Sequence, residues 1–250
     1  QGRAARERTQ HHEREQHDAL LIQRALMPAT LPITTRLEVA GAWRPAGTLG
    51  GDCYDVFTFT PDVIGFSIAD VAGKGLPAAL LMSSLQAAVR AFAGEVSPPQ
   101  AVCDSVNRLL CAQMIAGRFA TMVYLRLDAA RGVLTYANAG HNPPLLARTS
   151  GQVEALHASG TVLGVFPEIE YTGREVALHK GDRLLLYTDG VTEARNRDEE
   201  EFGEERLSAA FARHRHLNAA DLHAAVMDDV TQFATAGFQD DATLLAVAIR

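Results

Sequence analysis

The sequence predicts an α+β fold in which two antiparallel β-sheets pack face to face, with helices on the outside and one helix ahead of them. Apolar segments rich in β-branched and aromatic residues fall into two groups along the chain, and long helical segments separate these groups. Short turn sequences such as residues 128–132 join neighbouring strands within a group. Such turns favour antiparallel pairing, because a parallel crossover needs about a dozen residues or more.

The first element is a predicted helix over residues 4–27, a segment dense in helix-forming residues. Its apolar residues gather near the end, and Pro28 and Pro32 then stop the helix. A mostly polar helix with an apolar end has no partner within its own segment. We therefore expect residues 1–33 to be a linker or coiled-coil helix, which either stays single or pairs with a second copy, and residues 34–250 to form one domain. Because the chain begins without methionine, we expect it to be a piece of a longer protein.

Periodicity and helix-stop residues place the other elements. Strands are predicted at 36–45, 53–59, 62–70, 119–128, 132–140, 143–148, 170–178, 182–189 and 242–250. Helices are predicted at 75–94, from 97–99 to about 115, at about 203–213 and at about 218–235.

Composition excludes several functional classes. The formal net charge is −7, from 23 basic and 30 acidic residues, and it does not favour a nucleic-acid-binding protein, which needs a basic face. Three cysteines without a CxxC pair do not suit a disulfide framework or structural zinc, and they fit a reducing compartment. No apolar run in the sequence approaches the roughly 18–20 residues that span a bilayer. These features predict a cytoplasmic protein that neither binds nucleic acid nor crosses a membrane.

Four aspartates lie at the ends of predicted strands. Asp70 and Asp189 each end an apolar strand, whereas Asp52 and Asp240 each begin one. In antiparallel pairs the end of one strand lies beside the start of its neighbour, so all four carboxylates could meet at one edge of the sheets. Any one of them could be only a turn residue, but their recurrence favours a common site. Hard divalent cations would relieve the repulsion among these carboxylates, and two such ions can bind a phosphate and activate a water.

Five sequence motifs, which follow one another along the chain, together resemble those of a known family. They are GGDCYD (50–55), ADVAGKGLPAALLM (69–82), NAGHNPPLL (138–146), YTDGVTEA (187–194) and QDDATLL (239–245). Together they resemble the PPM-type metal-dependent protein serine/threonine phosphatases, in the bacterial SpoIIE/RsbU-like branch, over about residues 20–250. The resemblance implies a β-sandwich that uses two divalent cations, Mn²⁺ or Mg²⁺, to remove phosphate from serine or threonine of a protein.

The resemblance also implies a cellular role. Relatives of this kind are output modules of signalling proteins and act on small phosphorylated regulators, such as anti-anti-sigma factors. In them the N-terminal helix connects a sensor to the catalytic domain and often mediates dimerisation. We therefore expect a phosphorylated protein as the partner and a possible homodimer through residues 1–33.

The same resemblance assigns the metal ligands residue by residue. They would be Asp52, the bridging Asp70, the backbone carbonyl of Val71, Asp189 and Asp240. Gly51 and Gly73 would permit close approach of the backbone to metal or phosphate.

Other residues of the motifs receive supporting roles. Asp55 and Asp241 are candidates for the groups that surround the ligands, and Asp55 could contact a metal through water. Eukaryotic relatives carry a histidine, proposed as the general acid, where this chain has Ala72. Metal-bound water, Lys74 or His141 could protonate the leaving oxygen instead, although a histidine in front of residues 142–143 more often braces the turn through side-chain hydrogen bonds.

Two other functions remain open from the sequence. The chain could be an inactive pseudophosphatase that serves as a protein-binding module, although all four aspartates are present. It could also be a phosphoesterase of small molecules, although the sequence offers no evident pocket for stacking a nucleobase.

Overall fold

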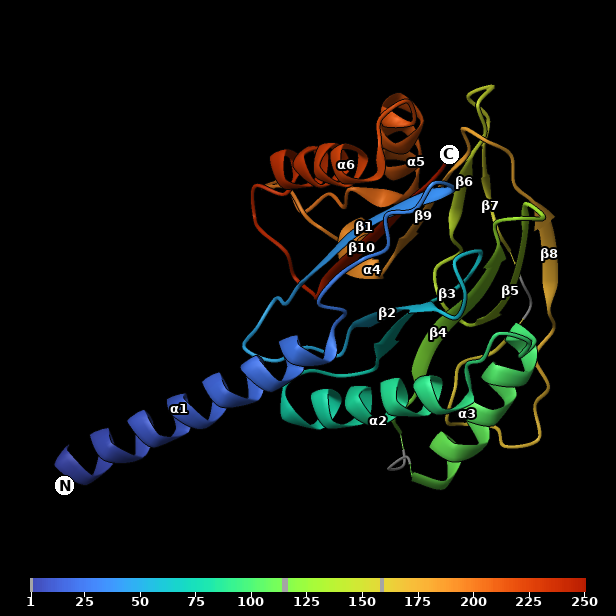
Figure 1. Cartoon of the computed structure of the whole chain (residues 1–250). Coiled ribbons are helices and arrows are strands. Elements are labelled where there is room, and N and C mark those ends of the chain that lie inside the picture. The colour runs from blue at the N-terminus through green and yellow to red at the C-terminus, as the bar shows by residue number, and fades with distance from the viewer. Residues whose placement is uncertain (1, 114–116, 158–159) are drawn as a thin grey trace.

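The computed structural model describes residues 2–113, 117–157 and 160–250, with side chains from residue 14 onward. Within these residues two five-stranded antiparallel sheets pack against each other, and helices cover both outer faces (Figure 1). The predicted fold class is thereby confirmed.

Helix α1 (Gly2–Leu26) precedes the sandwich and extends away from it, so that only its C-terminal part lies against the domain (Figure 1). Sheet A has the strand order β1 (Leu37–Arg44), β10 (Ala242–Ile249), β9 (Arg183–Tyr187), β6 (Leu145–Ala147) and β7 (Val153–Ala155). Sheet B has the order β2 (Cys53–Thr58), β3 (Val63–Val71), β4 (Ala120–Asp128), β5 (Val133–Ala139) and β8 (Arg174–Ala177).

Two groups of helices cover the sheets. Sheet B packs against α2 (Leu76–Phe92) and α3 (Pro99–Gln113), and sheet A packs against α4 (Asp189–Thr192), α5 (Gly203–His214) and α6 (Ala219–Phe233). Asn218 directly precedes α6, and its side chain accepts a hydrogen bond from the backbone N–H of Asp221 and so caps the helix. No helix in the described part of the chain is long and apolar enough to cross a membrane.

The central core lies between the two sheets. Phe66, Ile68 and Leu125 of sheet B meet Leu186 and Leu245 of sheet A, and all five are fully buried. Because side chains alternate along a strand, residues between these positions point to the helices on the outer face. Most central strands are therefore apolar on both faces, as sheets covered on both sides require.

The structure corrects the ends of several predicted elements. The predicted strand over 143–148 is shorter, because Pro143 and Pro144 have no N–H to donate to a neighbouring strand. The strand predicted over 170–178 begins only at Arg174, and the N–H of Tyr171 instead donates to Asp104 Oδ1 of α3. Strand β7 and the single-turn helix α4 were not predicted. The predicted end of the third helix, near residue 115, lies outside the described residues.

Leu186→Ala should test the core between the sheets. Removing most of a fully buried leucine leaves a cavity, so we expect the free energy of unfolding to fall by about 2–5 kcal/mol. Leu80→Ala, at a leucine that is 64% exposed, is the matched control and should change stability little. Urea unfolding of both variants measures the difference, and equal losses would contradict the assignment of Leu186 to the core.

Candidate functional site

The strand pairing brings the four predicted aspartates to one end of the sandwich. In sheet B, β2 and β3 are antiparallel, so Asp52 just before β2 lies near Asp70 at the end of β3. In sheet A, β9 and β10 are antiparallel, so Asp189 just after β9 lies near Asp240 just before β10. Each sheet therefore contributes one pair of aspartates, as the antiparallel arrangement predicted.

Electrostatic repulsion acts between the two pairs of aspartates, across the junction of the sheets. Burial, followed by the negative charges of Asp189 and Asp240, raises the pKa of Asp70 to about 7. Asp70 belongs to sheet B and the other two belong to sheet A, so this repulsion acts across the junction of the sheets. The pKa of Asp189 is also raised, first by burial and then by Asp240.

Asp52 is the most enclosed member of the cluster, with 1% of its surface exposed. Its Oδ2 accepts hydrogen bonds from the hydroxyls of Thr188 and Thr243, both at 2.6 Å. Burial, and then the charge of Asp70, raises the pKa of Asp52 well above its ordinary value. Two threonines of sheet A thus hold an aspartate of sheet B in place.

Sequence reasoning missed Thr188 and Thr243. A signal was present for the first, because Thr188 directly precedes Asp189 in a strongly apolar strand. A buried hydroxyl next to a candidate ligand needs a hydrogen-bond partner, and a neighbouring carboxylate is the natural one.

Glycines bring the backbone close to the carboxylates. A Cβ at Gly51 would lie 2.5 Å from the carbonyl oxygen of Val71 and 3.1 Å from Asp70 Oδ1, so a side chain here would fill the space beside both oxygens. A Cβ at Gly50 would collide with the carboxylate of Asp241, and one at Gly190 with the backbone oxygen of Asp241. Gly73 has a φ of 110°, which disfavours other residues at the turn after Val71.

Asp241 supports the loop that precedes Asp52. Its Oδ1 accepts the N–H of Ala46 at 2.8 Å, and its Oδ2 accepts the N–H of Gly51 at 2.7 Å. Both oxygens of this buried carboxylate are therefore used to hold residues 46–51, a role consistent with the supporting position that the sequence suggested.

Lys74 provides a positive charge at the mouth of the pocket. Its ammonium lies 3.0 Å from Asp240 Oδ2 and donates a hydrogen bond to the carbonyl of Gln239 at 2.9 Å. The side chain is 65% exposed, so solvent screens much of this pairing.

His141 lies behind the pocket and bridges the two sheets. Its Nδ1 is 2.8 Å from the hydroxyl of Thr121, which pairs with Asp70, and its Nε2 is 3.2 Å from the carbonyl of Tyr187, two residues before Asp189. A neutral ring protonated on Nε2 satisfies both contacts. Burial lowers the pKa of His141 to about 4. These contacts favour the bracing role over that of a proton donor.

Asp55 lies elsewhere in the hydrogen-bond network. Its Oδ2 accepts hydrogen bonds from Arg90 Nε at 2.5 Å and Gln86 Nε2 at 3.4 Å, both on α2. Neither hydrogen bond joins Asp55 to the four aspartates described above. It fastens β2 to α2 instead.

Gln23 of α1 is a further residue that sequence reasoning missed. It is 3% exposed, its Nε2 donates to the carbonyl of Gly50 at 2.6 Å, and its Oε1 accepts the N–H of Gly50 at 3.1 Å. One side-chain amide thus holds both backbone groups of a residue two positions before Asp52. The available signal was a lone glutamine in the apolar end of the helix.

The chemistry of these donors fits hard divalent cations. The aspartate carboxylates and the Val71 carbonyl present only oxygen, the ligand type that Mg²⁺ and Mn²⁺ prefer. In the described part of the chain, no three His, Cys, Asp or Glu side chains form a ready cage for one ion.

Comparisons with known proteins agree with this geometry. Residues 60–250 match the family described as Stage II sporulation protein E (SpoIIE). The chain is 31% identical over 228 residues to the phosphoserine phosphatase RsbU of Bacillus subtilis. This alignment covers 90% of this chain and 67% of RsbU. Across three curated relatives it spans from 34% to 67% of their length.

Solved structures share the fold. The SiaA-PP2C domain of Pseudomonas aeruginosa superposes with a TM-score of 0.84 at 23% identity, over 97% of this chain and 98% of that domain. RsbX in complex with magnesium superposes with a TM-score of 0.68 at 15% identity, over 88% of this chain and 99% of RsbX. At these identities the similarity concerns the fold alone.

Gln23→Leu should loosen the loop before Asp52. The leucine fills similar space but leaves the buried N–H and carbonyl of Gly50 without their partner, so we expect a loss of about 1–3 kcal/mol in unfolding free energy. Hydrogen exchange at the Gly50 amide should become faster. Arg24→Ala, on the exposed side of the same helix, is the control, and equal exchange in both variants would contradict the role of Gln23.

Protonation of the His141 ring should lower the stability of the protein in mild acid. Its folded pKa lies below the value of about 6.5 in the unfolded chain, so the unfolded state binds more protons as pH falls from 6.5 towards 4. Between pH 7 and pH 5 the wild type should lose about 2 kcal/mol more than His141→Gln. Urea unfolding measures this loss, and NMR titration of the ring checks it independently. A ring that titrates near 6.5 would contradict the assignment.

Proposed function

The chain belongs to the SpoIIE family and is a serine/threonine phosphatase domain of the PP2C type, and we propose that it dephosphorylates a regulatory protein with the help of two divalent cations, Mn²⁺ or Mg²⁺. The observation that carries the proposal is the convergence of Asp70 from sheet B with Asp189 and Asp240 from sheet A. Buried carboxylates that repel one another form a stable site only when protons or cations neutralise them.

The ions would be held by Asp52, Asp70, Asp189, Asp240 and the carbonyl of Val71. When bound, the ions supply positive charge to the phosphate oxygens and make a water acidic enough to attack at neutral pH. Gly51 leaves room beside the Val71 carbonyl and the Asp70 carboxylate for this purpose. Thr188 and Thr243 keep one oxygen of Asp52 occupied and so orient the other.

Lys74 is the residue best placed to assist the leaving group. Its ammonium contacts Asp240 and is 65% exposed, so it carries protons beside the aspartates where a phosphate would be held. Ala72 offers no side-chain proton, and His141 is engaged on both ring nitrogens. The leaving serine or threonine oxygen therefore takes its proton from water or from Lys74.

The relatives suggest the setting of this activity. We propose that residues 1–33 form a linker helix, that residues 34–250 form the phosphatase domain, and that the domain is the output module of a larger cytoplasmic signalling protein. RsbU is named a phosphoserine phosphatase, so a phosphorylated anti-anti-sigma-type regulator is the proposed substrate. A homodimer through α1 remains part of the proposal.

Asp70→Asn and Asp189→Asn should each abolish activity without unfolding the protein. We expect phosphate release from a phosphoserine peptide with Mn²⁺ to fall by about two orders of magnitude or more, because the metal-dependent step loses a ligand. Mn²⁺ should raise the thermal unfolding midpoint of the wild type and much less that of the variants.

Asp198→Asn, on an exposed loop, is the control and should behave as the wild type. Full metal-dependent turnover in both test variants would contradict the proposed metal-dependent mechanism. A wild type that binds Mn²⁺ but releases no phosphate would favour a protein-binding module, and a preference for nucleotides over phosphopeptides would favour a small-molecule phosphoesterase.

A further inference from the structure

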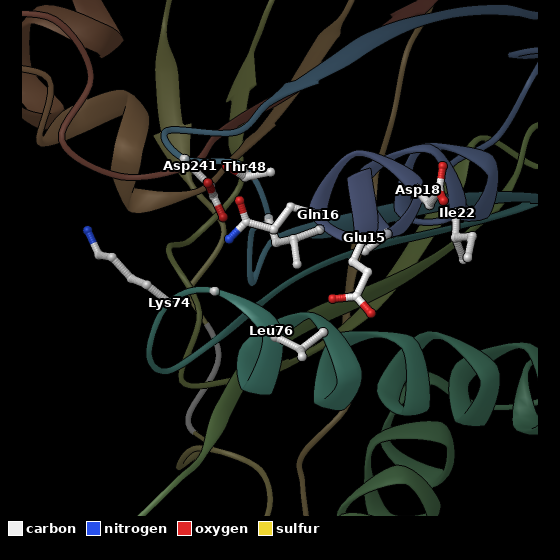
Figure 2. Close-up of a pocket in the computed structure, with 12 residues that line it drawn as sticks. Glu15, Gln16, Asp18, Ile22, Thr48, Lys74, Leu76 and Asp241 are labelled. Atoms are coloured by element: carbon white, nitrogen blue, oxygen red, sulfur yellow. The ribbon is translucent and has the colours of Figure 1, made fainter. Parts of the chain in front are cut away.

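A groove lies between α1, residues 47–49 and the start of α2, and we name it the α1–α2 groove. Its volume is about 660 Å³, and its walls include Asp18 and Ile22 of α1, Leu49, and Leu76 of α2. Lys74 and Asp241 line it as well. Figure 2 shows α1 passing over the first turns of α2, with Lys74 and Asp241 towards one end of the groove.

The groove opens beside the aspartates. Lys74 contacts Asp240, and Asp241 follows Asp240 directly in the chain. A serine or threonine side chain that delivers phosphate to the aspartates would therefore bring its own backbone close to this end of the groove. The residues next to the phosphorylated one could then continue along it.

Specific contacts hold the α1 wall in place. Gln23 binds both backbone groups of Gly50, and the carbonyl of Leu26 accepts a hydrogen bond from Gln86 Nε2 of α2 at 2.7 Å. The end of α1 is thus fastened to the loop on one side of the groove and to the helix on the other. A wall held in this way can select what it contacts.

The chemistry of the groove indicates its occupant. Ile22 is 65% exposed and Leu76 is 55% exposed, although both lie in a concave surface where a partner could cover them. Asp18 adds an exposed negative charge on the α1 side. An apolar residue would bury these side chains, and a basic residue would complement Asp18.

We propose that the α1–α2 groove binds the polypeptide segment next to the phosphorylated residue and prefers an apolar and a basic side chain in it. This inference rests on the proposed phosphatase function, because the substrate must be a phosphorylated protein for the segment to exist. Helix α1 would then be part of the substrate site as well as a linker.

Steady-state kinetics on synthetic phosphoserine peptides tests the proposal in the full chain with Mn²⁺. One pair of peptides carries Leu and Lys before or after the phosphoserine, and a second pair carries Gly and Glu at the same positions. The wild type should show a KM about five- to tenfold lower for one Leu/Lys peptide than for its Gly/Glu counterpart. Ile22→Ser and Leu76→Ser should remove most of this difference, and Asp18→Lys should remove the preference for Lys.

Matched controls separate the groove from general effects. Leu21→Ser and Leu80→Ser change leucines that are 50% and 64% exposed on the same two helices but do not line the groove, so both should keep the wild-type KM. Hydrolysis of a small aryl phosphate should be equal in all variants, since it has no flanking segment. Sedimentation should show the same oligomeric state for the wild type and Ile22→Ser.

The outcomes distinguish the two claims. A wild type that hydrolyses neither peptides nor aryl phosphate overturns the proposed function. A wild type that hydrolyses both, with a peptide KM unaffected by Ile22→Ser and Leu76→Ser, overturns the groove proposal alone. A change of oligomeric state in Ile22→Ser with an unchanged KM also overturns it, because the groove would then hold a second copy of the chain.

Discussion

Repulsion among carboxylates at the junction of the two sheets is the constraint on which the rest of the site depends. Burial, and then the charges of Asp189 and Asp240 from the opposite sheet, raise the pKa of Asp70 to about 7. A fold does not gather such groups without a compensating interaction. The compensation within the chain is partial, since Lys74 pairs with Asp240 at an exposed position and two threonine hydroxyls bind Asp52. The remaining negative charge supports the proposal that these aspartates bind cations.

The surrounding structure holds this unfavourable arrangement in place. The large apolar interface between the sheets stabilises the sandwich independently of the aspartates. At the edge of that interface His141 joins the strand beside Asp70 to the strand before Asp189, and Asp241 fastens the loop before Asp52. Gln23 extends the same network to α1. Helix α1 and the loop before Asp52 are thus parts of one hydrogen-bonded unit.

Sequence reasoning could predict the features that depend on local pattern. Strand periodicity located most of both sheets. The position of Asp70 and Asp189 at strand ends, and of Asp52 and Asp240 at strand starts, placed each pair at neighbouring strands, as the observed pairing has them. The pattern could not show which polar groups would meet across the sandwich. Thr188 and Thr243 lie far from Asp52 in sequence, and their contact depends on how the two sheets pack. The bond between Gln23 and Gly50 likewise depends on where α1 lies against the domain.

A crystal structure of the protein with Mn²⁺, with the ions located by anomalous scattering, tests the central claim most directly. The account predicts two ions in the pocket between the sheets, with Asp70 contacting both and with Asp189 and Asp240 among their ligands. Ions that bind elsewhere, or an Asp70 that contacts no ion, would contradict it.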